Sequence, residues 1–202
     1  MRSVAPALQT GVIVTEDEVE SLTAAWRTRW GGNPVGYELR GRHADRWVRF
    51  HSLPQSKRYA ETEGEYAIIL DRHHQVLTEL GSDENLYLIA GYFEDARGGI
   101  SPDPRHPGAI PWLTIEPDDR SYFEIPLRLY VAAIPHDRRT LDPLLRGVAD
   151  DEIGYAIIAP LDLRWLYHPY DGGADCIAPT ADERDVLKSR HADWLSAHPA
   201  GL

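Results

Sequence analysis

The sequence predicts a single α+β domain, in which a mixed or largely antiparallel sheet is covered by about four helices. Three observations predict this fold class. The chain has 202 residues, which is the length of one domain. Its 43% hydrophobic and 26% charged residues are ordinary for a globular protein. Helical and strand-like segments alternate without the regular rhythm of a parallel α/β fold. We expect residues 1–14 to form an N-terminal arm and residues 15–202 to form the domain.

Capping residues mark where the expected helices begin. Thr15, Thr62 and Thr180 each precede a glutamate by three residues, and this capping box satisfies the first N–H groups of a helix. Apolar residues at spacings of three and four then form one buried face. The helices are expected from Thr15 to Gly31, from Thr62 to Gly81, from Thr180 to near Pro199, and from Leu141 to Val148 with Thr140 as its cap.

Seven segments between the helices resemble strands. Tyr155–Ala159 is apolar without alternation, so we expect a central strand buried on both faces. In Phe123–Ala133 leucines alternate with Arg128 and Tyr130, so we expect one face of that strand to be exposed to water. The remaining strands are expected at Arg46–Phe50, Leu86–Phe93, Trp112–Ile115, Arg164–His168 and Asp175–Ala178.

Residues 97–112 are rich in turn-forming residues, with four prolines and three glycines. A loop of this length inside a domain is either a tolerated surface insertion or a lid over a site. The surface insertion is the simpler interpretation of the two.

Charge and cysteine usage limit the classes of function. The formal net charge is −11, and a surface this acidic repels nucleic acid and anionic membranes. Cys176 is the single cysteine, so the chain forms no internal disulfide, and the reducing cytoplasm is the expected compartment. The sequence contains no secretory leader pattern and no apolar run long enough for a membrane span. The negative net charge therefore favours a basic protein as the binding partner.

A basic segment stands out within this acidic chain. Residues 40–58 carry six Arg and Lys residues against the single acid Asp45. Guanidinium, imidazole and hydroxyl donors in one turn suit a phosphate or carboxylate ligand. The alternative is that these cations form salt bridges with the abundant carboxylates. The candidate ligand-binding residues are Arg49, His51, Ser52, Ser56, Lys57, Arg58 and Tyr170.

The segment from His168 to Asp175 is the second candidate. His168, Asp171 and Asp175 are candidate catalytic residues, because a histidine and a carboxylate can act as a general base and its orienting group. The alternative is a hairpin in which the Gly172-Gly173 pair makes the turn and the side chains are structural. The chain lacks a phosphate-binding loop, a dinucleotide motif, a nucleophile elbow and a zinc-protease motif, so no cofactor and no metal are predicted.

Both segments support a family resemblance. Arg46–Pro54 followed by Ser56–Tyr59 resembles a group of uncharacterised actinobacterial-type proteins, and Leu166–Asp171 with Gly173 and Asp175 resembles a wider bacterial domain family of unknown function. Members of the wider family carry an aspartate and an arginine where this chain has Gly172. The resemblance implies no established activity and no catalytic residue. It associates the chain with toxin–immunity neighbourhoods.

Two functional hypotheses follow. The first is an interaction module of the immunity type, which binds a basic partner through one of four acidic clusters: Glu16–Glu20, Glu61–Glu65, Glu116–Asp119 or Asp150–Glu152. The second is an enzyme or binding protein that holds a small anion between the two segments, with residues 97–112 as a lid. The geometry of Arg49 and Arg58 discriminates between them. If both arginines pair with Asp171 and Asp175, the segments are structural and the interaction hypothesis gains.

Overall fold

The computed structural model describes residues 14–81, 83–93, 108–119, 121 and 123–196. Among them, five α-helices surround one seven-stranded sheet in which every neighbouring pair of strands is antiparallel. The α+β prediction is confirmed. The expected arm falls on residues 1–13, apart from Val14, and lies outside the described residues, as do residues 97–107 of the proline-rich loop.

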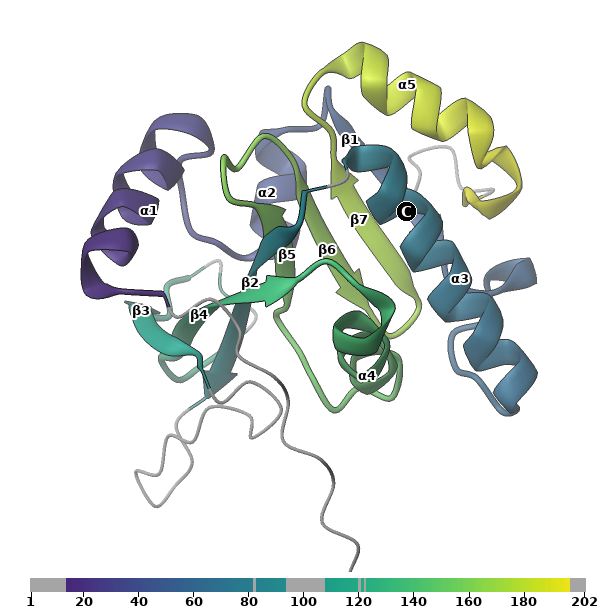
Figure 1. Ribbon diagram of the computed structural model, residues 1–202, viewed down its shortest axis with the longest axis horizontal. Coiled ribbons are helices and arrows are strands. Elements are labelled where there is room, and N and C mark those ends of the chain that lie inside the picture. Colours follow the sequence, from purple (N-terminus) through teal and green to yellow (C-terminus); the bar gives the residue numbers. More distant parts are fainter. Residues whose placement is uncertain (1–13, 82, 94–107, 120, 122, 197–202) are drawn as a thin grey trace, which may run out of the picture.

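The sheet has the strand order β1-β7-β6-β5-β2-β4-β3 (Figure 1). Its strands are β1 Trp47–His51, β2 Asn85–Phe93, β3 Ile110–Ile115, β4 Leu127–Pro135, β5 Ile157–Pro160, β6 Leu166–Tyr170 and β7 Gly173–Ile177. The helices are α1 Glu16–Arg29, α2 Gly36–Arg42, α3 Glu63–Leu80, α4 Arg138–Ala149 and α5 Ala181–Arg190, with short 3-10 turns η1 Pro54–Ser56 and η2 Ala192–Trp194.

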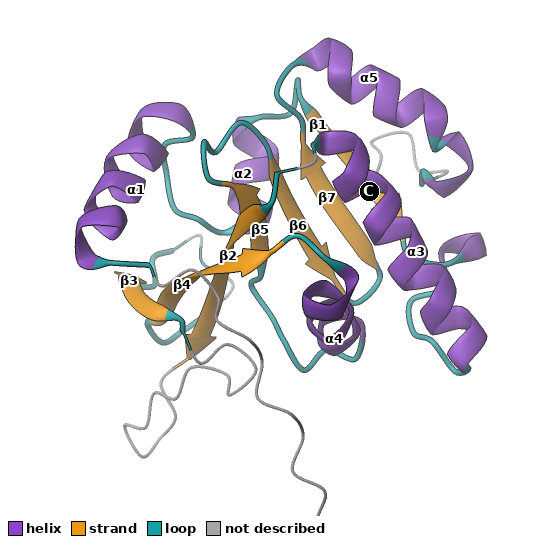
Figure 2. Ribbon diagram, in the orientation of Figure 1, coloured by secondary structure: helices purple, strands orange, loops and turns teal. Residues whose placement is uncertain are grey.

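Helices cover both faces of the sheet, and a large hydrophobic core lies on each face (Figure 2). One core packs α3, α4 and α5 against Leu88 and Ile158, and the other packs α1 and α2 against Ile89 and Ile157. All four residues of β5 are buried. The expected central strand is therefore confirmed, although it begins two residues later than Tyr155.

The threonine caps are confirmed, and one predicted cap is wrong. The Thr15, Thr62 and Thr180 side chains accept N–H bonds from residues three positions ahead, an interaction that contributes about 1 kcal/mol per helix. Helix α4 begins at Arg138 rather than Leu141, because the Asp137 carboxylate accepts the Thr140 N–H at 2.8 Å and acts as the cap. The last helix ends earlier than expected, at Arg190.

Three further elements differ from the prediction. Strand β4 has no exposed face, since Tyr130 is only 6% exposed. The strand lies between β2 and β3, and the ring of Tyr92 packs edge-on against Tyr130 with centroids 5.8 Å apart. Helix α2 was not predicted, because the glycines and Pro34 before it indicated a loop. Strand β3 begins at Ile110, so the last three residues of the expected loop are strand.

A buried histidine makes the stability of this fold depend on pH. His73 on α3 is 3% exposed, its Nδ1 lies 2.6 Å from the Tyr167 hydroxyl, and burial lowers its pKa to about 3. The unfolded chain binds this proton with a pKa near 6.5, so protons favour unfolding as the pH falls from 6.5 towards 3. Between pH 7.5 and pH 5 this group alone removes about 2 kcal/mol of stability.

His73→Gln is therefore expected to lessen the acid sensitivity, because glutamine keeps a polar contact with Tyr167 but does not titrate. Urea unfolding at pH 7.5 and pH 5 measures the difference. Equal losses of stability in wild type and variant would show that His73 is not the responsible group.

Candidate functional site

The two candidate segments lie side by side in the fold. Strand β1 pairs with β7 in antiparallel register, which places Arg49 opposite Asp175 and His51 opposite Gly173. Beyond the strand, the Ser52 N–H donates to the Gly172 carbonyl at 3.1 Å. The second segment is a β6–β7 hairpin, as expected for the glycine pair. The segments therefore meet by direct strand pairing.

Arg49 is neutralised by the second segment. Its Nε and Nη2 donate to the two carboxylate oxygens of Asp175 at 2.7 and 2.9 Å, and Asp175 is 4% exposed. The guanidinium also lies over the rings of Trp47 and Tyr170, 5.6 and 5.1 Å from their centroids. Burial raises the pKa of Tyr170, so its hydroxyl stays protonated. Such a two-bond pairing is among the strong forms of an arginine–carboxylate contact, and it uses both oxygens of Asp175.

Two further cations of the basic segment are also paired with carboxylates. Arg58 donates to Asp171 at 2.6 Å, where the arginine side chain is 64% exposed and the aspartate side chain 8%. Lys57 contacts Glu65 at 2.6 Å and Glu61 at 3.2 Å. Ser56 lies exposed at the end of η1. The expected anion ligands Arg49 and Arg58 thus bind the expected catalytic carboxylates.

His168 is held by its surroundings. Its Nδ1 donates to the Ala156 carbonyl at 2.7 Å, and a Cβ at Gly36 would lie 2.0 Å from the imidazole ring. Glycine is therefore required where α2 crosses β6. Burial lowers the pKa of His168, so the ring is neutral and Nε2 keeps its lone pair. His168 pairs in register with Asp175, yet that carboxylate already holds Arg49.

His51 and Ser52 lie apart from these ion pairs. Both line a small cavity between the end of β1 and α3, together with Arg72 and His73. Arg72 was not predicted, since nothing in the sequence relates a cation on α3 to the end of β1. The seven expected ligand residues thus do not form one site, since His51 and Ser52 line this cavity and the other five lie outside it.

A larger cleft of about 350 Å³ lies between α3 and the β4–α4 turn. Polar side chains line it, and its charged groups each contact a neighbouring group: Glu79 contacts His191, Arg138 contacts Asp71, and Asp137 caps α4. The remaining lining residues are His74, Gln75, Thr78 and His136.

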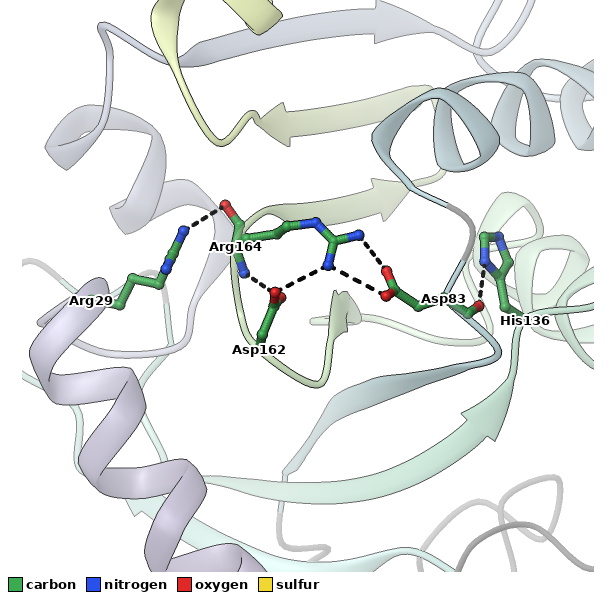
Figure 3. Close-up of polar contacts among 5 residues, drawn as sticks. All are labelled: Arg29, Asp83, His136, Asp162 and Arg164. Atoms are coloured by element: carbon green, nitrogen blue, oxygen red, sulfur yellow. Dashed lines mark hydrogen bonds and ion pairs between the residues drawn. The ribbon is translucent and has the colours of Figure 1, made fainter.

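His136, which lines this cleft, also belongs to a polar cluster that the sequence did not predict (Figure 3). Arg164, in the β5–β6 turn, binds the carboxylates of Asp83 and Asp162, while its carbonyl accepts from Arg29 at the end of α1. The His136 Nδ1 donates to the Asp83 carbonyl at 3.1 Å. The cluster connects α1 with the α3–β2, β4–α4 and β5–β6 turns. These contacts between distant parts of the chain indicate a structural role.

The fold brings two acidic clusters onto one surface. Helices α3 and α4 pack together so that Arg146 of α4 binds Glu63, and the Tyr66 hydroxyl of α3 donates to Asp150. The start of α3 therefore lies beside the end of α4. We call this surface the acidic face; it comprises Glu61, Glu63, Glu65, Asp150, Asp151 and Glu152.

An exposed aromatic side chain borders the acidic face. Tyr59 is 48% exposed, and the charge of Asp151 acts on both Tyr59 and Arg58. Two cations, Lys57 and Arg146, oppose the six carboxylates directly. The surface is therefore acidic with an aromatic edge, a composition that suits binding of a basic protein surface.

Among the described residues, no three His, Cys, Asp or Glu side chains gather in a way that could hold a metal ion. No described helix has the length and hydropathy to cross a membrane.

Comparison with known proteins identifies a family. No curated protein and no solved structure matches the chain. A family match spans residues 35–199, which include both candidate segments, and it confirms the expected membership in a family of unknown function. The chain therefore belongs to the family described as Domain of unknown function (DUF3885).

Proposed function

We propose that this protein is an interaction module of the immunity type, which binds and blocks a basic protein partner through the acidic face. The single observation that carries the proposal is the position of three exposed carboxylates, Asp150–Glu152, at the C-terminal end of α4. The helix dipole is negative there, so carboxylates at this end oppose helix stability. Their placement favours a role in binding.

The rest of the acidic face strengthens this argument. Glu63 and Glu65 lie in the first turn of α3, where carboxylates stabilise a helix, so alone they indicate nothing about function. Their proximity to Asp150 and Asp151 raises the local negative potential. Such a potential accelerates encounter with a basic partner and orients it, and Tyr59 offers an apolar contact at the border.

The anion-binding hypothesis gains no such support. Arg49 and Arg58, the two cations suited to a planar anion, hold Asp175 and Asp171. A ligand between the segments would have to compete with both carboxylates for these two guanidinium groups. The ion pairs satisfy the condition under which we expected the segments to be structural.

A charge-neutral triple variant tests the proposal. Protein from the native host is captured with three baits: wild type, Asp150→Asn/Asp151→Asn/Glu152→Gln, and a control with the same charge change on α1, Glu16→Gln/Asp17→Asn/Glu20→Gln. The expected result is a basic protein that binds wild type and control with the triple variant about tenfold weaker or more, measured between purified proteins. The triple variant should keep a Tm close to that of wild type, because removing charges that oppose the α4 dipole offsets the weaker hydrogen bond from Tyr66 to position 150.

Immunity-type function requires one more result. When the captured partner is produced in cells and harms them, co-expression of wild type should protect those cells. Co-expression of the triple variant should not. A basic partner whose binding is equally weakened by both variants, or only by the α1 control, contradicts the assignment to the acidic face.

A further inference from the structure

A cavity of about 10 Å³ lies where β1 ends against α3. Ser52, Arg72, His73 and Tyr167 contribute polar walls, and the ring of Trp194 from η2 lines it as well. A space of this size accommodates one water molecule and no larger ligand. Neither the ion pairs of the two segments nor the acidic face uses it.

Ser52 is one of two polar groups at this cavity that need an explanation, since the buried Nε2 of His51 also has no hydrogen-bond partner among the described residues. Ser52 is 3% exposed, and its side-chain Oγ has no hydrogen-bond partner among the described residues. Its backbone N–H is satisfied by the Gly172 carbonyl, so the end of β1 holds the hydroxyl in place. Burying a hydroxyl without a partner costs about 1–3 kcal/mol, and native proteins rarely tolerate this.

The other polar walls retain hydrogen-bonding capacity. His73 Nδ1 and the Tyr167 hydroxyl bond to each other at 2.6 Å, and Arg72 donates to the His51 carbonyl at 2.7 Å. A hydroxyl can both donate and accept, and a guanidinium has five N–H groups, so further bonds are available at Tyr167 and Arg72. A bound water needs two to four such partners.

We propose that this cavity binds one water molecule, which bridges the Ser52 hydroxyl to the polar wall formed by α3 and β6. Through its hydrogen bonds this water connects the end of β1 to α3 and β6, next to the ring of Trp194. A halide ion is disfavoured, because the charge of Asp193 offsets that of Arg72 and His73 is neutral. Ser52 is thus a water-binding residue of the fold rather than a ligand of an external anion.

Two measurements on the full chain test this proposal. A crystal structure of wild type grown in bromide should show an ordered peak within hydrogen-bond reach of Ser52 Oγ and no anomalous bromide signal. In thermal unfolding, Ser52→Ala should lower Tm by about 2–6 °C, because the water loses a partner. The exposed Ser56→Ala is the matched control and should shift Tm by less than about 1 °C.

The sign of the Ser52→Ala effect is decisive. If the site holds no water, alanine removes an unsatisfied hydroxyl and Tm rises. A rise in Tm, a featureless cavity in the crystal, or a bromide peak each overturns the proposal. An ordered water together with a lowered Tm supports it.

Discussion

Arg49→Ala is expected to lower the free energy of unfolding by about 3–5 kcal/mol. The substitution leaves the carboxylate of Asp175, which is 4% exposed, buried without the cation that binds both of its oxygens. An uncompensated buried charge is among the few defects that destabilise a domain this strongly. The Arg49 guanidinium also lies over the rings of Trp47 and Tyr170, and these contacts are lost as well.

Two controls separate charge from packing, and urea unfolding at neutral pH measures all variants. Arg58→Ala breaks the neighbouring pair, but the Arg58 side chain is 64% exposed and water replaces it, so a clearly smaller loss is expected. Arg49→Met combined with Asp175→Leu removes both charges and should recover most of the stability lost by Arg49→Ala. Similar losses for Arg49→Ala and Arg58→Ala would contradict the assignment of Arg49–Asp175 as the buried pair that holds the two segments together.

Gly173→Ala is expected to cost about 3 kcal/mol or more. A Cβ at this position would lie 2.2 Å from the Phe50 carbonyl oxygen, which is backbone of the paired strand β1. Because neither strand can shift without breaking the β1–β7 hydrogen bonds, the clash has no inexpensive relief. The same shift would separate Arg49 from Asp175, so the β1–β7 strand pairing and the Arg49–Asp175 ion pair would be lost together.

The adjacent glycine is the matched control. A Cβ at Gly172 would lie 3.3 Å from Cγ of Arg58, a flexible side chain that can move aside, and 3.6 Å from Cε2 of Tyr170, which is an ordinary contact distance. Circular dichroism and urea unfolding of the two alanine variants should therefore differ sharply, with Gly172→Ala close to wild type. If Gly173→Ala unfolds at the wild-type urea concentration, the close approach of β1 and β7 is wrong.

The sequence alone determined the elements whose causes are local. The starts at Thr15, Thr62 and Thr180 could be predicted because a cap and its partner N–H lie three residues apart. The buried strand at β5 followed from apolar residues within one short run. Membership in the family followed from the residues of the two segments.

Contacts between distant residues were decided only by the tertiary structure. Asp175 lies 126 residues beyond Arg49, and the sequence offered many carboxylates as partners for that arginine. The burial of Tyr130 depends on the position of β4 inside the sheet, and the acidic face depends on how α3 packs against α4. In each case the deciding energy comes from burial and pairing across the chain, which a local pattern does not encode. Hydrogen bonds within one turn can be predicted from neighbouring residues, whereas strand order and charge pairing exist only once the chain has folded.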